Sequence, residues 1–256
     1  MHLCSPSCQS SGRLVAGLPY FRGAALRVSD RKPPAVTLPS TRPEVTGPIY
    51  IEAMADMHKL DLYARHKDEY VATDGPVLVD VKPARFLAIQ GRGEPGAEAF
   101  QSAVNALYTV AFAVKMARKN AGRDYTVSKL EGLWWGKGKA SNFLHEPKSG
   151  WNWQLLIRVP DWIQSREVTQ AAETLLKKGK PREVLNVELT VLSEGRSVQM
   201  LHVGSYEEEA GAIRRLADFA AANRLSFHGR HHEIYLSDPR RIPTNKLRTI
   251  LRYPVE

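Results

Sequence analysis

Two glutamates stand in the middle of otherwise apolar or aromatic segments of this sequence. Glu131 lies within Leu-Glu-Gly-Leu-Trp-Trp, and Glu233 lies within His-His-Glu-Ile-Tyr-Leu. Removing an ionised carboxylate from water costs free energy, so a carboxyl group in such a place tends to take up a proton. It could then act as a general acid or base, hold a water molecule, or pair with a cationic ligand. The alternative is that each side chain points to solvent from the polar face of its strand.

The tryptophans are crowded into one part of the chain. All five fall between positions 134 and 162 of a chain of 256 residues. Tryptophan rings offer large flat surfaces that stack on aromatic ligands and attract cations. We therefore expect at least two of them to line a binding pocket, although two or three could be ordinary core or edge residues. The candidates are Trp134, Trp135, Trp151 and Trp153.

The other residue types with catalytic or ligating chemistry do not complete a site. His231 and His232 alternate across a strand and have no Cys or Asp at ligand spacing, so we expect no metal. The glycine turns at 91–93 and 136–139 match neither a dinucleotide nor a phosphate-loop pattern, and no Gly-x-Ser-x-Gly elbow is present. Cys4 and Cys8 both lie in the first ten residues, which excludes a disulfide framework. We expect no cofactor and a reducing compartment.

The charge distribution argues against a nucleic-acid partner. The net charge is +9, but almost half of it lies in residues 1–50, and basic and acidic residues are interspersed elsewhere. A nucleic-acid-binding surface more often gathers basic residues on one face, with aromatic residues between them. No segment approaches the roughly 18 apolar residues of a membrane-spanning helix. We therefore expect a cytoplasmic protein that binds neither nucleic acid nor membrane.

Residues 1–56 are predicted to form a disordered extension. They are rich in Pro, Ser, Gly and Arg and lack apolar periodicity. A basic, acid-poor start is also compatible with an organellar transit peptide, although its prolines argue against a long helix. The folded domain is expected over residues 57–256.

From residue 77 onward the pattern predicts short strands and amphipathic helices. In the first half we expect strands at 77–81, 85–89, 125–135 and 151–157, with helices over 97–119 and from Ser165 onward. In the second half we expect strands at 184–192, 196–203 and 231–236, with a helix over 206–223. Ser193-Glu194-Gly195 is a hairpin signal between the first two of these strands.

The two halves follow the same plan. Residues 77–160 and 183–256 align as tandem β-α-β-β repeats, which sets Glu131 opposite Glu233. Such a repeat predicts an α+β fold in which two similar units are related by a pseudo-two-fold axis. Their antiparallel sheets would share a central groove, and this groove would be the ligand pocket. The two glutamates would then handle water together.

Two motifs resemble the gyrase-inhibitor-like (GyrI-like) family of small-molecule-binding proteins. One is His202-Val203-Gly204-Ser205-Tyr206-Glu207-Glu208, followed by a helix and by Glu233-Ile234-Tyr235-Leu236-Ser237-Asp238-Pro239. The other is Leu130-Glu131-Gly132-Leu133-Trp134-Trp135 with Trp151-Asn152-Trp153. This second motif is similar to a stand-alone branch of the family that includes hydrolases of cyclopropane-bearing, DNA-alkylating natural products. The resemblance covers about residues 57–256.

The resemblance implies a fold and a function. Family members have tandem β-α-β-β repeats around a central ligand pocket, and a glutamate matching Glu233 is the pocket carboxylate of multidrug-sensing members. Tyr206 and Tyr235 match family residues close to that pocket. Nothing before residue 77 has the pattern of a helix-turn-helix, so direct DNA regulation is not expected. The implied activity is hydrolysis of cyclopropane-containing alkylators, a detoxification, with an aromatic or cationic small molecule as partner. The alternatives are a non-catalytic sensor or sequestering protein and a protein-protein modulator of the gyrase-inhibitor type.

Overall fold

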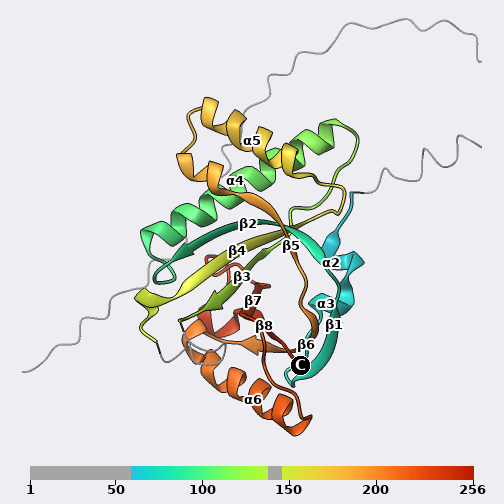
Figure 1. The fold of residues 1–256 in the computed structure, drawn as a ribbon, viewed down its shortest axis with the longest axis vertical. Coiled ribbons are helices and arrows are strands. Elements are labelled where there is room, and N and C mark those ends of the chain that lie inside the picture. Colours follow the sequence, from blue (N-terminus) through green and yellow to red (C-terminus); the bar gives the residue numbers. More distant parts are fainter. Residues whose placement is uncertain (1–58, 138–145) are drawn as a thin grey trace, which may run out of the picture.

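A computed structural model describes residues 59–137 and 146–256, so the extension predicted over residues 1–56 lies outside the described residues. Eight strands form one antiparallel sheet in the order β1-β6-β8-β7-β3-β4-β2-β5, and the α+β class predicted from the sequence is confirmed (Figure 1). The strands are β1 (Val77–Val81), β2 (Ala84–Arg92), β3 (Leu130–Trp135), β4 (Asn152–Val159), β5 (Glu188–Leu192), β6 (Gly195–Val203), β7 (His231–Tyr235) and β8 (Arg248–Pro254).

Three long helices accompany the sheet. They are α4 (Glu98–Asn120), α5 (Ser165–Lys177) and α6 (Glu209–Ala222), and two short helices, α2 (Leu62–Arg65) and α3 (Lys67–Tyr70), precede the first strand. The 3-10 turns are η2 (Lys148–Gly150), η3 (Arg182–Asn186), η4 (Tyr206–Glu208) and η5 (Thr244–Lys246). In Figure 1, α4 and α5 lie at one end of the molecule and α6 at the other, with the strands between them. None of the helices in the described ranges combines the length and the apolar character needed to cross a membrane.

Several predicted boundaries need correction. The strand expected over 125–135 starts only at Leu130, and the first part of the strand expected over 184–192 is the turn η3, which follows Pro181. The helix expected over 206–223 is divided between η4 and α6. Strand β8 and helices α2 and α3 were not predicted. Two arginines within Arg248–Pro254 obscure its apolar alternation, and one of them, Arg252, is buried.

The two repeats exchange their first strands. Strand β1 comes directly before β2 in the chain but pairs with β6, and β5 comes directly before β6 but pairs with β2. The hairpin predicted at Ser193-Glu194-Gly195 is therefore wrong, because this link crosses from one half of the sheet to the other. Strands β3 and β7, one from each repeat, pair at the centre and join the halves.

The sheet has two differently covered faces. Trp134, Leu155 and Ile157 share an apolar core with α4, while Met200, Leu251 and Tyr253 share another with α6. Directly paired residues of antiparallel strands point to the same face. Trp134 pairs with His231, whose ring lies 4.7 Å from that of Tyr253, so both cores are on one side, here called the helix face.

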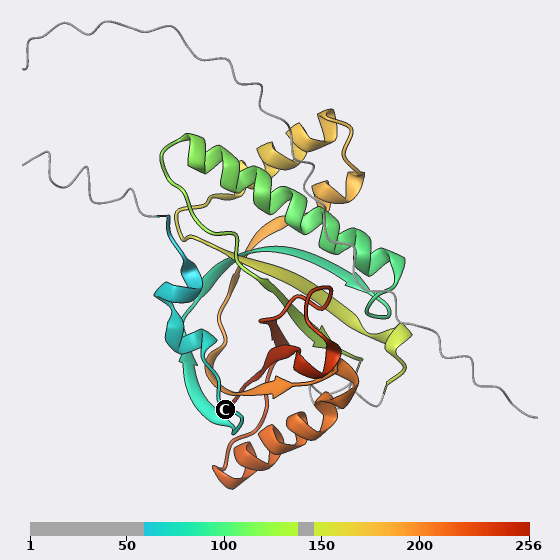
Figure 2. The same ribbon diagram turned by 180° about the vertical axis from the view of Figure 1, so that it is seen from behind.

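The opposite face is covered by residues 59–76, here called the strap, which include α2 and α3. Tyr63 and Tyr70 pack with Ile234 and Ile250 on this side. Figure 2 shows the two short helices next to β1 at the border of the sheet. We call this side the strap face.

Gly91 makes room for a tryptophan in the core beneath α4. It pairs with Trp153, and a Cβ atom at position 91 would lie 2.2 Å from the Trp153 ring. No side chain other than hydrogen fits there unless the indole moves.

We predict that Gly91→Ala destabilises the fold by about 1–3 kcal/mol, the usual cost of overpacking a core. The free energy of unfolding in urea and the Trp emission spectrum measure this effect. Gly75→Ala is the matched control, because a Cβ atom there would meet nothing within 4 Å. Equal stability of the two variants would contradict the prediction.

Candidate functional site

The central strands carry the two glutamates on opposite faces of the sheet. Glu131 pairs with Ile234, and Glu233 pairs with Gly132, so Glu131 points to the strap face and Glu233 to the helix face. The expectation that the repeat sets them across one groove is wrong. Equivalent residues of two related repeats lie on the same face of the sheet, so the alignment of Glu131 with Glu233 was one position out of register at these strands.

Glu233 is held by an aromatic hydrogen-bond chain. The Tyr235 hydroxyl donates to Glu233 Oε2 at 2.7 Å and accepts from Trp134 Nε1 at 3.2 Å. His231 Nε2 lies 3.3 Å from Glu233 Oε1. A Cβ atom at Gly132 would approach Trp134 Nε1 to 3.0 Å and the Tyr235 hydroxyl to 3.1 Å, so glycine leaves these groups the space they need. The carboxylate is thus fixed from both sides and only 8% exposed.

A second carboxyl group, which sequence reasoning missed, lies against Glu233. Glu209 in the first turn of α6 is buried, and one of its carboxyl oxygens lies within 4.8 Å of a carboxyl oxygen of Glu233. Burial, followed by the charge of Glu233, raises the pKa of Glu209 well above its usual range. Two buried carboxylates this close repel each other when both are ionised, which favours a proton on one of them. Tyr235 donates to Glu233, and the raised pKa favours the protonated form of Glu209.

The helical spacing contained a signal for Glu209. Position 209 precedes Ala212, Ile213 and Leu216, which form the buried stripe of α6. A glutamate in register with that stripe must face the core. The run Glu207-Glu208-Glu209 looks instead like a solvated helix start, and for this reason the position was not selected.

The aromatic residues separate into two groups. Trp134, Trp151 and Trp153 lie together on the helix face, where the Trp134 ring is 5.9 Å from Trp151 and both Trp134 and Trp153 contact Phe100. Trp135 points to the strap face instead, with the Arg230 guanidinium 3.6 Å from the centre of its ring.

The two predicted tyrosines join the helix-face group. The Tyr206 and Tyr235 rings meet edge to face at 5.8 Å. Burial, followed by the charge of Glu233, raises the pKa of both phenols, so they stay protonated near neutral pH. The structure therefore brings together six of the predicted residues: Glu233, Trp134, Trp151, Trp153, Tyr206 and Tyr235. We call these six residues, together with Glu209 and His231, the Glu233 cluster.

Glu131 belongs to a separate buried network on the strap face. Its Oε1 accepts from the Tyr70 hydroxyl at 3.0 Å and from the Tyr63 hydroxyl at 3.2 Å, and its Oε2 lies 3.0 Å from His232 Nε2. On the other side of the ring, His232 Nδ1 lies 3.0 Å from Glu194. Glu131 is shielded from solvent: Oε1 accepts two hydrogen bonds, and Oε2 faces His232 as an ion pair.

The network is balanced in charge. Glu194 also accepts from Arg252 at 2.9 Å, and Glu69 accepts from Arg158 at 2.6 Å. Together with His232, the two arginines supply three cations, which face the carboxylates of Glu69, Glu131 and Glu194. Buried charges are tolerated when they are paired and hydrogen-bonded in this way.

His232 is the central cation of this network. Burial alone would lower its pKa, but the adjacent Glu194 and Glu131 outweigh that effect and raise the pKa to about 9. Burial would likewise raise the pKa of Glu194, but His232 and Arg252 lower it to about 2. Both ring nitrogens of His232 face a carboxylate, which also requires the doubly protonated imidazolium.

The comparisons with known proteins agree with this architecture. A family model described as the GyrI-like small molecule binding domain matches residues 76–256. This chain belongs to the GyrI-like family. The family predicted from the sequence motifs is therefore confirmed.

Three solved structures from Listeria innocua are similar to this GyrI-like domain. An uncharacterized conserved protein is 34% identical, with a TM-score of 0.72, and the match covers 77% of this chain and 100% of that chain. A hydrolase is 32% identical, with a TM-score of 0.71 and coverage of 78% and 100%. Another structure of a hydrolase is 32% identical, with a TM-score of 0.69 and coverage of 77% and 100%. No curated protein matches the chain.

One group of side chains in the described part of this GyrI-like domain could hold a metal ion. Glu209, His231 and Glu233 each offer a ligand atom, and these atoms lie within 4.8 Å of one another. Carboxylate and imidazole are common ligands of divalent transition metals. A metal would need Glu209 ionised, whereas its raised pKa favours the protonated form.

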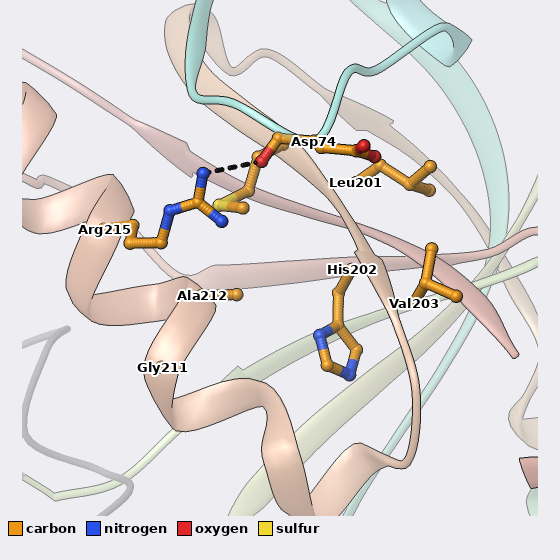
Figure 3. A pocket seen from close by; sticks show the side chains of 8 residues that line it. Asp74, Leu201, His202, Val203, Gly211, Ala212 and Arg215 are labelled. Atoms are coloured by element: carbon orange, nitrogen blue, oxygen red, sulfur yellow. Dashed lines mark hydrogen bonds between the residues drawn. The ribbon is translucent and has the colours of Figure 1, made fainter. Parts of the chain in front are cut away.

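A cavity of about 400 Å³ lies between α6 and β6 (Figure 3). Asp74, His202 and Arg215 line it together with small or apolar residues, and Arg215 donates to the Asp74 carbonyl oxygen at 2.9 Å. None of the predicted site residues borders this cavity. This cavity and the predicted site residues are therefore separate features of the described structure.

We predict that His232→Gln destabilises the domain by about 3–5 kcal/mol below pH 6.5, because it leaves two buried carboxylates without their cation. The pKa of His232 is raised, so its stabilising contribution is complete below 6.5, the unfolded value, and is lost as the pH rises through about 9. The difference in unfolding free energy between wild type and variant should therefore shrink over this range. Urea titrations at several pH values measure it.

The exposed His228 provides the matched control for this experiment. His228→Gln should leave the stability within about 0.5 kcal/mol of wild type at each pH, as expected for a surface substitution. A difference between wild type and His232→Gln that stayed constant up to pH 9 would show that His232 is neutral in the folded protein.

Proposed function

We propose that this GyrI-like domain binds an aromatic or cationic small molecule at the Glu233 cluster and hydrolyses it by adding water. The proposed substrates are cyclopropane-containing alkylating compounds, and the biological role is their detoxification. The observation that carries this proposal is the fixed Glu233 carboxylate, which Tyr235 ties to Trp134 within a group of three tryptophans. A base and a flat aromatic contact surface are thus joined in one rigid unit.

The relatives support hydrolysis rather than binding alone. The family is defined by small-molecule binding, and two of the similar Listeria innocua structures are described as hydrolases. At 32% identity over the whole of those chains, the catalytic framework can be shared. The substrate proposal comes from the resemblance of the tryptophan-rich segments to the cyclopropane-opening branch of the family.

Opening the cyclopropane ring by addition of water needs one general base and a well-oriented water and substrate. In a cyclopropane-fused dienone, a water oxygen attacks the strained ring carbon and forms a C–O bond, while a C–C bond of the cyclopropane breaks. The electron pair of that bond moves into the ring and onto the carbonyl oxygen, which becomes a phenol oxygen once it is protonated. Glu233 accepts the proton that water loses. Aromatisation drives the ring opening, and positioning and proton transfer supply the acceleration.

Tyr235 keeps Glu233 ready for this step. As a donor at 2.7 Å, its hydroxyl stabilises the ionised carboxylate and fixes one of its oxygens. The other oxygen is near His231, which can orient it further. The tryptophan faces and the negative charge also favour ligands that are cationic or electron-poor. The same features would serve a non-catalytic sensor or sequestering protein, and this is the second candidate.

The roles of the remaining predicted residues follow from their positions. We propose Trp134, Trp151, Trp153, Tyr206 and Tyr235 as the ligand-binding residues and Glu233 as the catalytic one. Glu131 and Trp135 lie on the other face of the sheet, and we assign them to the strap-face network and its surroundings rather than to substrate.

We predict that Glu233→Gln lowers kcat for ring opening by about 10²- to 10⁴-fold, because it removes the general base but keeps the shape of the side chain. The assay incubates the protein with a cyclopropane-fused dienone and follows the water adduct by mass spectrometry. The Kd of the same compound, from quenching of Trp fluorescence, should change much less than kcat.

Glu207→Gln serves as the control, since Glu207 is an exposed glutamate in η4. This variant should turn over the compound at the wild-type rate. Tight binding by wild type without any turnover above buffer would exclude the hydrolase and favour the sensor or sequestering protein. A stable protein partner that survives Glu233→Ala would instead favour the protein-protein modulator.

A further inference from the structure

We propose that the cavity between α6 and β6 is a second ligand site, and that it takes an amino acid with an apolar side chain. This inference goes beyond the proposed hydrolysis, because no residue of the Glu233 cluster borders the cavity. The cavity volume of about 400 Å³ lies within the range of small-molecule sites. The charges, the hydrogen-bonding groups and the free space of the lining identify the occupant.

Arg215 of α6 is the positive group of the lining. One of its guanidinium N–H groups donates to the Asp74 carbonyl oxygen at 2.9 Å. Within residues 59–137 and 146–256, this side chain forms no other hydrogen bond and no ion pair. A guanidinium has five N–H donors in a fixed fork, which matches a carboxylate through two parallel hydrogen bonds. The remaining donors of Arg215 are therefore suited to the carboxylate of a ligand.

Two hydrogen-bond acceptors belong to the same lining. The Asp74 carboxylate extends away from Arg215, while the carbonyl oxygen of the same residue faces the guanidinium (Figure 3). His202 is only 8% exposed, and its Nε2 lies 2.8 Å from the Ser205 carbonyl oxygen. Because a carbonyl oxygen only accepts, Nε2 carries the hydrogen, and Nδ1 of the neutral ring is an acceptor. In the described part of the chain, neither Nδ1 nor the Asp74 carboxylate has a hydrogen-bond partner.

The lining therefore combines one positive side chain with one negative side chain. A ligand with only a carboxylate would leave the charge of Asp74 unmatched, and one with only an amine would leave Arg215 unmatched. An amino acid matches both, because its carboxylate can accept from Arg215 and its ammonium group can donate to Asp74 and His202. Complementary charges of this kind give a site its specificity.

The rest of the lining provides an apolar surface and open space. Met200 and Ala212 belong to the apolar core beneath α6, and both border the cavity. Gly211 lies next to Ala212 in the helix, and a Cβ atom at this position would meet nothing within 4 Å. Glycine weakens a helix relative to alanine, and its use here leaves the space beside Ala212 open. An aliphatic side chain of the ligand fits this part of the cavity.

The walls of the cavity are fixed to each other without a ligand. The Leu201 amide of β6 donates to the Thr73 carbonyl oxygen of the strap at 2.8 Å. The hydrogen bond from Arg215 to Asp74 ties α6 to the same part of the strap. A preformed site loses less free energy on binding than one that must first be ordered. A bound amino acid would therefore bridge α6 and the strap across an existing cavity.

The experiment measures binding of L-leucine to the full chain by isothermal titration calorimetry. Two analogues test the two charged groups: 4-methylpentanoate lacks the ammonium group, and 3-methylbutylamine lacks the carboxylate. Leucine is preferred to an aromatic amino acid because the Glu233 cluster is the proposed site for aromatic molecules. We expect each analogue to bind with a Kd at least about 10-fold higher than that of leucine, since each has lost charge-assisted hydrogen bonds.

Four variants locate the bound leucine. Arg215→Gln should raise the Kd by about 10- to 100-fold, the usual effect of losing hydrogen bonds to a charged group. Its control is Arg214→Gln, a change at the exposed neighbouring arginine, which should bind as wild type does. Gly211→Leu should abolish binding, because its side chain fills the open space. Ala217→Leu adds the same side chain at an exposed position of α6 and should leave the Kd unchanged.

Each alternative outcome would overturn the proposal. Wild-type affinity in Gly211→Leu would place leucine outside this cavity, and equal affinity for leucine and either analogue would exclude recognition of both charged groups. Absence of leucine binding to wild type would refute the site itself. Thermal unfolding checks that each variant is folded. Gly211→Leu keeps Arg215 and its hydrogen bond to Asp74, so the two variants test the cavity in independent ways.

Discussion

The register between β3 and β7 is the constraint on which the rest of this structure depends. These two strands are the seam of the sheet, and their pairing decides which side chains face α4 and α6 and which face the strap. A shift by one residue would exchange the two sets, because side chains alternate along a strand. The observed register places the carboxyl groups of Glu209 and Glu233 on the helix face. It places a charge-balanced network on the other.

Much of the fold was accessible from the sequence because its signals are local. The apolar periodicity of residues 97–119 and the branched residues of 77–81 determined their elements almost to the residue. The pairing of the strands was not accessible in the same way. Ser193-Glu194-Gly195 has the composition of a tight turn, but Glu194 faces His232 and Arg252, and these long-range ion pairs accompany a crossing link instead. Such contacts have no local signature.

The candidate site also combines residues that have a local sequence signal with residues whose place depends on long-range pairing. Glu233, Tyr206, Tyr235 and three of the tryptophans could be selected by residue type and by motif, and they do lie together. Glu131 was selected for the same physical reason as Glu233, since both are carboxyl groups in apolar strands. Their different surroundings depend on a register of one residue, and the alignment of two divergent repeats cannot resolve it. Glu209 required knowledge of what α6 packs against.

The exchange of first strands makes each repeat depend on the other. A single repeat on its own would expose the edge of β2 or β6, because the strand that pairs there comes from the other repeat. An exposed strand edge seeks a partner, and an identical copy could supply the missing strand by a reciprocal swap. In its strand arrangement, the present chain is thus equivalent to a strand-swapped dimer joined into one chain. The two halves of this swapped arrangement differ in chemistry, because residues 183–256 contain no tryptophan.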